Sequence, residues 1–131
     1  MNRLPRAVAL VLCKNLELNP GSRDWALVGV FHALTFAAFP AYSRFVVYTA
    51  LYGGKGEGTM KLGITRLETG EEIYPHERWW TVPGQGLNVH VGVRVTNCPF
   101  PALWRCALSL SFDGRELTSR YLDVFLRRGS P

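Results

Sequence analysis

Apolar and polar residues alternate at every second position in several short runs of this chain, as in a β-strand with one buried face. The clearest run covers residues 87–96, where five apolar side chains share one face. They are Leu87, Val89, Val91, Val93 and Val95. A second alternation spans 104–112, and the Asp113-Gly114 pair that follows predicts a tight hairpin before a last strand at 122–126. Both runs are typical of an antiparallel sheet with one buried and one solvated face.

Further strands are expected in shorter segments that turn residues separate. These segments are 7–13, 25–31, 44–52, 59–67 and 71–82. The first two are expected to pair as a hairpin across a turn at 19–24. The Phe39-Pro40 step favours an extended connection in the segment before it, although 33–38 could hold a short helical turn. About eight strands joined by turns predict an all-β fold. We expect one domain over residues 1–131, a single antiparallel β-sandwich that is immunoglobulin-like in the broad sense, with an open β-barrel as the alternative.

The stretch YGGKGEG at 52–58 has the glycines and the lysine of a phosphate-binding loop. It matches neither the P-loop spacing nor the dinucleotide-binding fingerprint, and a strand pattern follows it where those motifs require a helix. We therefore interpret it as a hairpin tip between two antiparallel strands, with glycines at positive φ. Lys55 and Glu57 would then form a surface that faces a partner.

The chain has 131 residues, 47% of them hydrophobic, and a net charge of +5. The basic residues are scattered along the sequence, so a nucleic-acid partner is not expected. Three cysteines without a Cys-x-x-Cys pair favour reduced, buried thiols in a cytoplasmic protein. The apolar run at 7–12 is shorter than a signal-peptide core, and no stretch approaches the roughly 18 apolar residues of a membrane helix. We expect no membrane association.

Residues that could carry catalysis occur without a recognisable motif. The three histidines lack metal-ligand spacing, no nucleophile elbow is present, and no cofactor is expected. Cys98 precedes a proline and could be reachable from solvent, which leaves a thiol enzyme or small hydrolase as the least favoured alternative. The sequence therefore favours a protein that is not an enzyme.

The most promising functional segment is IYPHERWWTV. In a strand, Trp79 and Trp80 point to opposite faces, so one indole could stay exposed near Tyr74, His76, Glu77 and Arg78. Such an indole could anchor a protein partner or stack on a carbohydrate-like ligand. The alternative is that both indoles plug the two sides of a bend. We expect a non-catalytic binding or protein-interaction module, with a small-ligand domain as the alternative.

The segments ALVLC, WALVGVF, FPA, RFVVYTALYGGKGEG and FDGREL together resemble a family of small, uncharacterised bacterial β-sandwich proteins, a domain of unknown function. The resemblance covers most of the chain and implies a compact β-sandwich without an assigned activity. It implies no functional residues. A protein partner, or self-association through an unpaired edge strand, is the interaction we expect.

Overall fold

The computed structural model describes residues 3–82 and 88–127, and within them ten β-strands account for nearly all of the regular structure. The strands are β1 (Arg6–Cys13), β2 (Asn15–Leu18), β3 (Trp25–Val28), β4 (Ala33–Phe36), β5 (Ala41–Tyr52), β6 (Gly56–Arg66), β7 (Glu72–Val82), β8 (Asn88–Phe100), β9 (Arg105–Phe112) and β10 (Arg115–Leu126).

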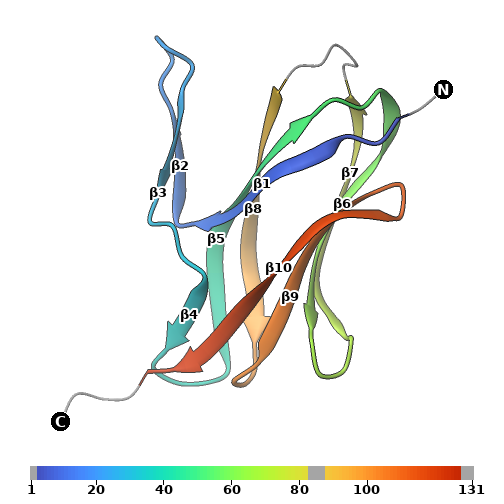
Figure 1. Cartoon of the computed structure of the whole chain (residues 1–131). Coiled ribbons are helices and arrows are strands. Elements are labelled where there is room, and N and C mark those ends of the chain that lie inside the picture. The colour runs from blue at the N-terminus through green and yellow to red at the C-terminus, as the bar shows by residue number, and fades with distance from the viewer. Residues whose placement is uncertain (1–2, 83–87, 128–131) are drawn as a thin grey trace.

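Two sheets make up the body of the fold (Figure 1). One has the strand order β1-β5-β8, and the other has the order β4-β10-β9-β6-β7. Neighbouring strands run antiparallel except β4, which lies parallel to β10. The β2-β3 hairpin is a separate two-stranded sheet that stands away from the body at the upper left of Figure 1. The expectation of an all-β, sandwich-like or barrel-like fold is confirmed.

The core consists of the facing sides of the two sheets. Val91, Val93 and Val95 of β8 are buried, as the alternation at 87–96 predicts. From the opposite sheet, Met60, Leu62 and Ile64 of β6 and Cys106, Leu108, Leu110 and Phe112 of β9 complete it. Leu87 and the expected turn at 83–86 lie outside the described residues.

Polar contacts link the two sheets at two places, one between β7 and β8 and the other between β10 and β1. On one side the backbone N–H of Thr96 in β8 donates to the Tyr74 hydroxyl in β7 at 3.4 Å. On the other side Arg120 of β10 donates from Nη1 to the carbonyl of Leu10 in β1 at 2.9 Å. These bonds satisfy backbone groups that would otherwise stay unpaired where the sheets meet.

One local prediction is wrong. The segments 7–13 and 25–31 do not form the expected hairpin: an isolated antiparallel bridge joins Leu12 and Phe31, but β1 pairs with β5, and β3 pairs with β2. Asn19 favours this shorter hairpin because its side-chain oxygen accepts from the backbone N–H groups of Gly21 and Ser22 and closes a tight turn. Of the two alternatives for 33–38, the structure has the extended one, because this segment contains β4, which extends the larger sheet beside β10.

The stretch 52–58 also differs from its prediction as a hairpin tip. It connects β5 to β6, which belong to different sheets, so it is a crossover between the two layers. Lys55 exchanges backbone hydrogen bonds with Arg3, and a Cβ on Gly54 would lie 2.6 Å from the Pro5 nitrogen. The expected positive φ is confirmed at Gly53, Gly54 and Gly56. The glycines therefore let the N-terminal segment cross the connection closely. The hairpin predicted at Asp113-Gly114 is present, with positive φ at both positions.

Candidate anion-binding site

The five residues predicted as a binding region on β7 divide between its two faces. Trp79 points outward and is 65% exposed, whereas Trp80 is half-buried and packs against the core. Tyr74, His76 and Arg78 share the face of Trp80, opposite Ile64, Leu62 and Met60 of β6. The prediction that the two indoles point to opposite faces is confirmed. The strand separates Trp79 from Tyr74, His76 and Arg78, whereas Glu77, which was also expected near it, shares its outer face.

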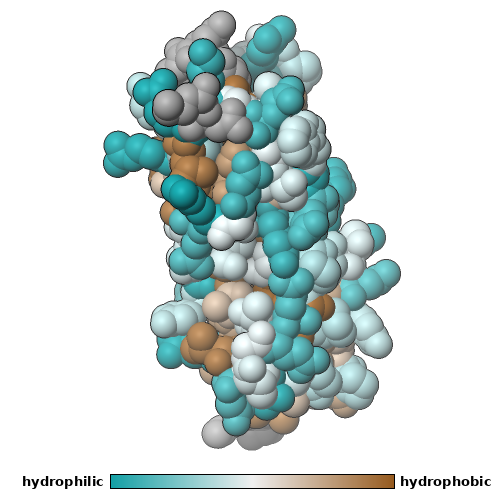
Figure 2. All heavy atoms as spheres, turned by 90° about the vertical axis from the view of Figure 1, so that its right-hand side faces the viewer, coloured by the Kyte–Doolittle hydropathy of each residue, from teal (hydrophilic) through white to brown (hydrophobic). Residues whose placement is uncertain are grey.

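The side of the molecule that carries β6 and β7 is mostly hydrophilic, with small and separated apolar areas (Figure 2). Lys55 and Glu57 are both exposed, as predicted. Glu57 belongs to β6, where its carboxylate accepts a 3.4 Å hydrogen bond from the Thr81 hydroxyl. Neither residue lines the hollow described below.

The three cysteines are free and completely buried, which confirms the expected buried thiols and corrects the prediction that Cys98 is reachable. Burial raises the pKa of Cys98 to about 12 and that of Cys106 to about 11. Burial also raises the pKa of Cys13. Because a thiol must ionise to act as a nucleophile, Cys98 is a core residue that packs as a small hydrophobe.

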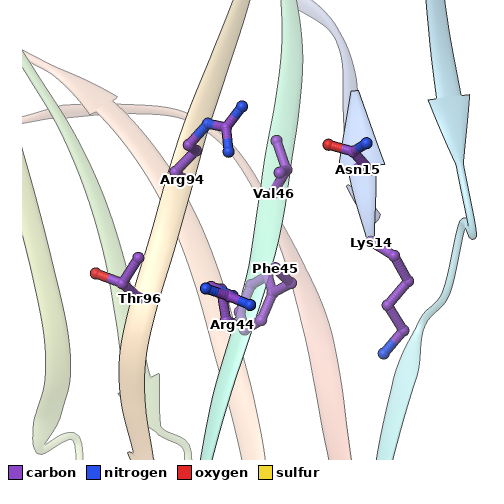
Figure 3. Close-up of a pocket in the computed structure, with 7 residues that line it drawn as sticks. All are labelled: Lys14, Asn15, Arg44, Phe45, Val46, Arg94 and Thr96. Carbon is purple, nitrogen blue, oxygen red and sulfur yellow. The ribbon is translucent and has the colours of Figure 1, made fainter. Parts of the chain in front are cut away.

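A hollow of about 440 Å³ lies on the outer side of the β1-β5-β8 sheet (Figure 3). We call it the cationic pocket, because Lys14, Arg44 and Arg94 line it. Its other lining residues are Asn15, Phe45, Val46 and Thr96. The three cations come from three separate segments: the link between β1 and β2, the first half of β5, and the middle of β8.

Local backbone structure sets the positions of these cations. Arg94 faces outward on β8, opposite Val46 of β5. The pairing of β5 with β8 shifts between Ser43 and Phe45, and Asn97 has a φ of +53° at this bulge. A bulge redirects the side chains beside it, and here Arg44 lies near Thr96 (Figure 3).

Lys14 approaches from the opposite side of the hollow. Its backbone N–H donates to the carbonyls of Val28 and Gly29 at the base of the β2-β3 hairpin. Its ammonium lies 4.6 Å from the centre of the Phe31 ring, which is a cation–π contact.

Most basic residues in the described ranges form no ion pair, and the three cations of the cationic pocket differ from the others in lining one hollow together. Elsewhere, Lys61 pairs with Glu72 at 2.9 Å, Arg66 with Glu68 at 2.9 Å and Arg105 with Asp123 at 3.1 Å. Among residues 3–82 and 88–127, no ion pair involves Lys14, Arg44 or Arg94. Three unpaired cations around one hollow produce a positive potential that attracts an anion.

A second, smaller cavity of about 230 Å³ adjoins the cationic pocket and shares Val46 and Arg94 with it. We call it the hairpin groove, because it lies between the β2-β3 hairpin and the sheet. Its remaining lining is Leu16, Leu18, Trp25 and Gly92. Gly92 leaves room for the Leu16 side chain to pack over β8, since a Cβ at position 92 would lie 2.5 Å from Leu16 Cδ1.

An aromatic cluster anchors the hairpin next to this groove. Trp25 of β3 lies 6.1 Å from Tyr48 and 5.8 Å from His90, measured between ring centres. Tyr48 and His90 stack on each other and share a hydrogen bond between the tyrosine hydroxyl and Nδ1 of the histidine. His90 therefore points outward, as its strand pattern predicts, and helps to hold the hairpin on the sheet.

Comparison with known families identifies the chain at the level of a family. Residues 8–125 match a family of unknown function, DUF6941. The chain belongs to this family. The expected membership in a domain of unknown function is thereby confirmed. No curated protein matches the chain.

Two features are absent from the described residues. Within 3–82 and 88–127 no three His, Cys, Asp or Glu side chains lie in a group that could hold a metal ion. The same ranges contain no helix with the length and apolar content that a bilayer crossing requires.

Sequence reasoning missed the cationic pocket. The alternation at 87–96 already placed Arg94 and Thr96 on the solvated face of β8, and this was the available signal. It did not show that Arg44 and Lys14 lie beside them, because that depends on the pairing of β5 with β8 and on the path of the chain after β1.

Proposed function

We propose that this chain is a non-catalytic protein-interaction module that binds an acidic group of a partner protein in the cationic pocket. The observation that carries the proposal is that Lys14, Arg44 and Arg94 line one hollow and that, among the described residues, none of the three forms an ion pair. A carboxylate placed there would accept charge-assisted hydrogen bonds, and arginine can make them in bidentate form.

The distribution of charge favours a protein over a nucleic acid. Proteins that bind nucleic acids usually carry a stripe of cations that follows the phosphate backbone, often with exposed aromatic rings on which bases stack. Here the three cations surround a single hollow, and the adjoining cavity is mainly apolar. One acidic group beside an apolar contact is typical of a protein interface.

The non-catalytic part of the proposal is supported by Cys98, whose burial keeps the thiol protonated at neutral pH. We also propose a cytoplasmic location, which is supported by the three free cysteines, since reduced thiols persist in that compartment.

A second candidate function is a carbohydrate-like ligand that stacks on Trp79. Its support is the 65% exposure of this indole on the outer face of β7. Self-association through an edge is a third way to acquire a partner, because β7 and β8 each end a sheet. A symmetric antiparallel pair of β7 strands centred on Glu77 or Arg78 would set like charges opposite each other, which disfavours that particular edge.

The proposal is tested with the single variants Arg44→Gln and Arg94→Gln, the double variant, and Arg115→Gln as a control for the loss of one exposed arginine. The probe is an acetylated peptide of four Gly-Glu repeats, titrated by NMR at low salt. A hydrogen bond to a charged group contributes about 1.5–3 kcal/mol. We therefore expect each pocket variant to bind at least tenfold more weakly, the double variant not measurably, and the control as tightly as the parent chain.

Salt provides an independent check of the same interaction. Binding should weaken as the ionic strength rises from about 0.01 to 0.15 M, because the Debye length falls from about 30 to 8 Å. Equal affinity of the double variant and the Arg115→Gln control, or no binding by the parent chain, would overturn the proposal.

A further inference from the structure

The cationic pocket and the hairpin groove together form one continuous surface of mixed chemistry. Arg94 and Val46 line both cavities, so a ligand in one of them borders the other. The groove contributes Leu16, Leu18 and Trp25, of which Leu18 is 54% exposed at its rim. An apolar surface beside an unpaired cationic cluster is suited to a ligand that carries both an acid and an apolar group.

The size of the groove limits what can enter it. A cavity of about 230 Å³ is too small for a helix, whose diameter with side chains is about 10–12 Å. A single apolar side chain is the largest protein group that fits. Burying it against Leu16, Leu18 and Trp25 would add hydrophobic stabilisation to the ionic contact.

Strand geometry gives the distance between an acid bound in the cationic pocket and an apolar side chain bound in the hairpin groove. Gly92 lies in the groove, Arg94 lies between the cavities, and Thr96 lines the cationic pocket; all three face outward from β8. Residues two apart on a strand are separated by about 7 Å. Side chains on one side of an extended peptide have the same repeat. An acid in the pocket and an apolar side chain in the groove therefore match positions two apart in an extended segment.

We propose that the partner is recognised through an extended acidic segment with a bulky apolar residue two positions from its acid, the acid in the cationic pocket and the apolar side chain in the hairpin groove. This inference rests on the proposed function and names the class of ligand for the same surface. A free phosphate or a nucleic acid would occupy only the cationic pocket, and these occupants are alternative outcomes of the test.

Three acetylated seven-residue glycine peptides serve as probes: one with glutamate alone, one with leucine two positions after the glutamate, and one with leucine directly after it. In an extended chain the last of these directs leucine to the opposite side. NMR titration is expected to show at least fivefold tighter binding for the two-position peptide than for the other two. Pyrophosphate and a short single-stranded DNA are titrated as competitors.

Two variants alter the groove without touching the three cations. Gly92→Leu displaces Leu16 from the groove wall, because even a Cβ at position 92 would lie 2.5 Å from Leu16 Cδ1, and Leu18→Gln removes an exposed apolar wall. Leu103→Gln is the matched control, because Leu103 is 56% exposed and lies outside both cavities. Both groove variants should reduce the advantage of the two-position peptide to below twofold and leave the glutamate-only peptide unaffected. The control should keep the full advantage.

The outcomes separate this inference from the proposed function. If the glutamate peptide binds and Arg44→Gln abolishes its binding, but leucine adds nothing at either position, the groove proposal fails and the acidic-group proposal stands. Tighter binding of DNA or pyrophosphate than of every peptide overturns the peptide ligand. If Gly92→Leu does not fold, Leu18→Gln still decides, because an undiminished leucine advantage in that variant contradicts the groove.

Discussion

Replacing Phe45 with alanine is expected to lower the free energy of unfolding by about 3–5 kcal/mol, the usual cost of removing a buried phenylalanine. Phe45 is 1% exposed, and Phe31 packs edge-on against it with 5.6 Å between ring centres. Its ring also lines the inner wall of the cationic pocket. The measurement is urea-induced unfolding, with the midpoint and slope compared between variant and parent.

Tyr42 is the matched control for this change. It is an aromatic residue of the same strand but is 68% exposed, so Tyr42→Ala should alter the free energy of unfolding by less than about 0.5 kcal/mol. Similar midpoints for Phe45→Ala and Tyr42→Ala would contradict the placement of β5 between the core and the pocket.

Alkaline pH is expected to destabilise the protein strongly. Burial raises the pKa of Cys106 to about 11 and that of Cys98 to about 12, against an ordinary value near 9. In the folded chain these thiols stay protonated while those of the unfolded chain ionise. Their stabilising contribution is complete below pH 9 and is lost as the pH rises through the folded values. Between pH 9 and these folded pKa values, each thiol lowers the free energy of unfolding by about 1.4 kcal/mol per pH unit. The two thiols together lower it by about 3 kcal/mol per pH unit.

The check is chemical unfolding at pH 8, 9, 10 and 11 with a reductant present. The double variant Cys98→Ala, Cys106→Ala is the control, since it retains every tyrosine and lysine that titrates at high pH. It should start from a lower stability at pH 8 but lose less with each pH unit. A slope identical to that of the parent chain would show that the two thiols are not protected as their burial requires.

Local patterns predicted much of this fold, because apolar residues at every second position directly indicate which face of a strand is buried. The alternation at 87–96 identified the core face of β8, and the adjacent positions of Trp79 and Trp80 placed them on opposite faces. The glycines of 52–58 indicated positive φ for a similarly local reason. In each case the neighbours along the chain determine the result.

Strand pairing was harder to predict from the sequence, since it depends on residues far apart in the chain. The segment 7–13 has the same apolar character as 25–31, and nothing local shows that β1 pairs with β5 rather than β3. For the same reason the 52–58 stretch resembled a hairpin tip, although its two strands lie in different layers.

The candidate site was the least predictable part. Lys14, Arg44 and Arg94 are separated by 30 and 50 positions in the chain and become neighbours only through the β5-β8 pairing and its bulge. The tryptophan pair drew attention to β7 because aromatic residues stand out in a sequence. A lone arginine on the solvated face of a strand does not, and its importance depends on which other charges the fold brings near it.

The most direct test of the central claim is a map of the binding surface. The parent chain, labelled with ¹⁵N, is titrated with the peptide that carries leucine two positions after glutamate, and backbone amide shifts are followed. We expect the largest shifts at Lys14, Asn15, Arg44, Arg94 and Thr96, with smaller ones at Leu18 and Gly92. Shifts concentrated on β7 around Trp79 or at Lys55, with the cationic pocket unaffected, would contradict the claim.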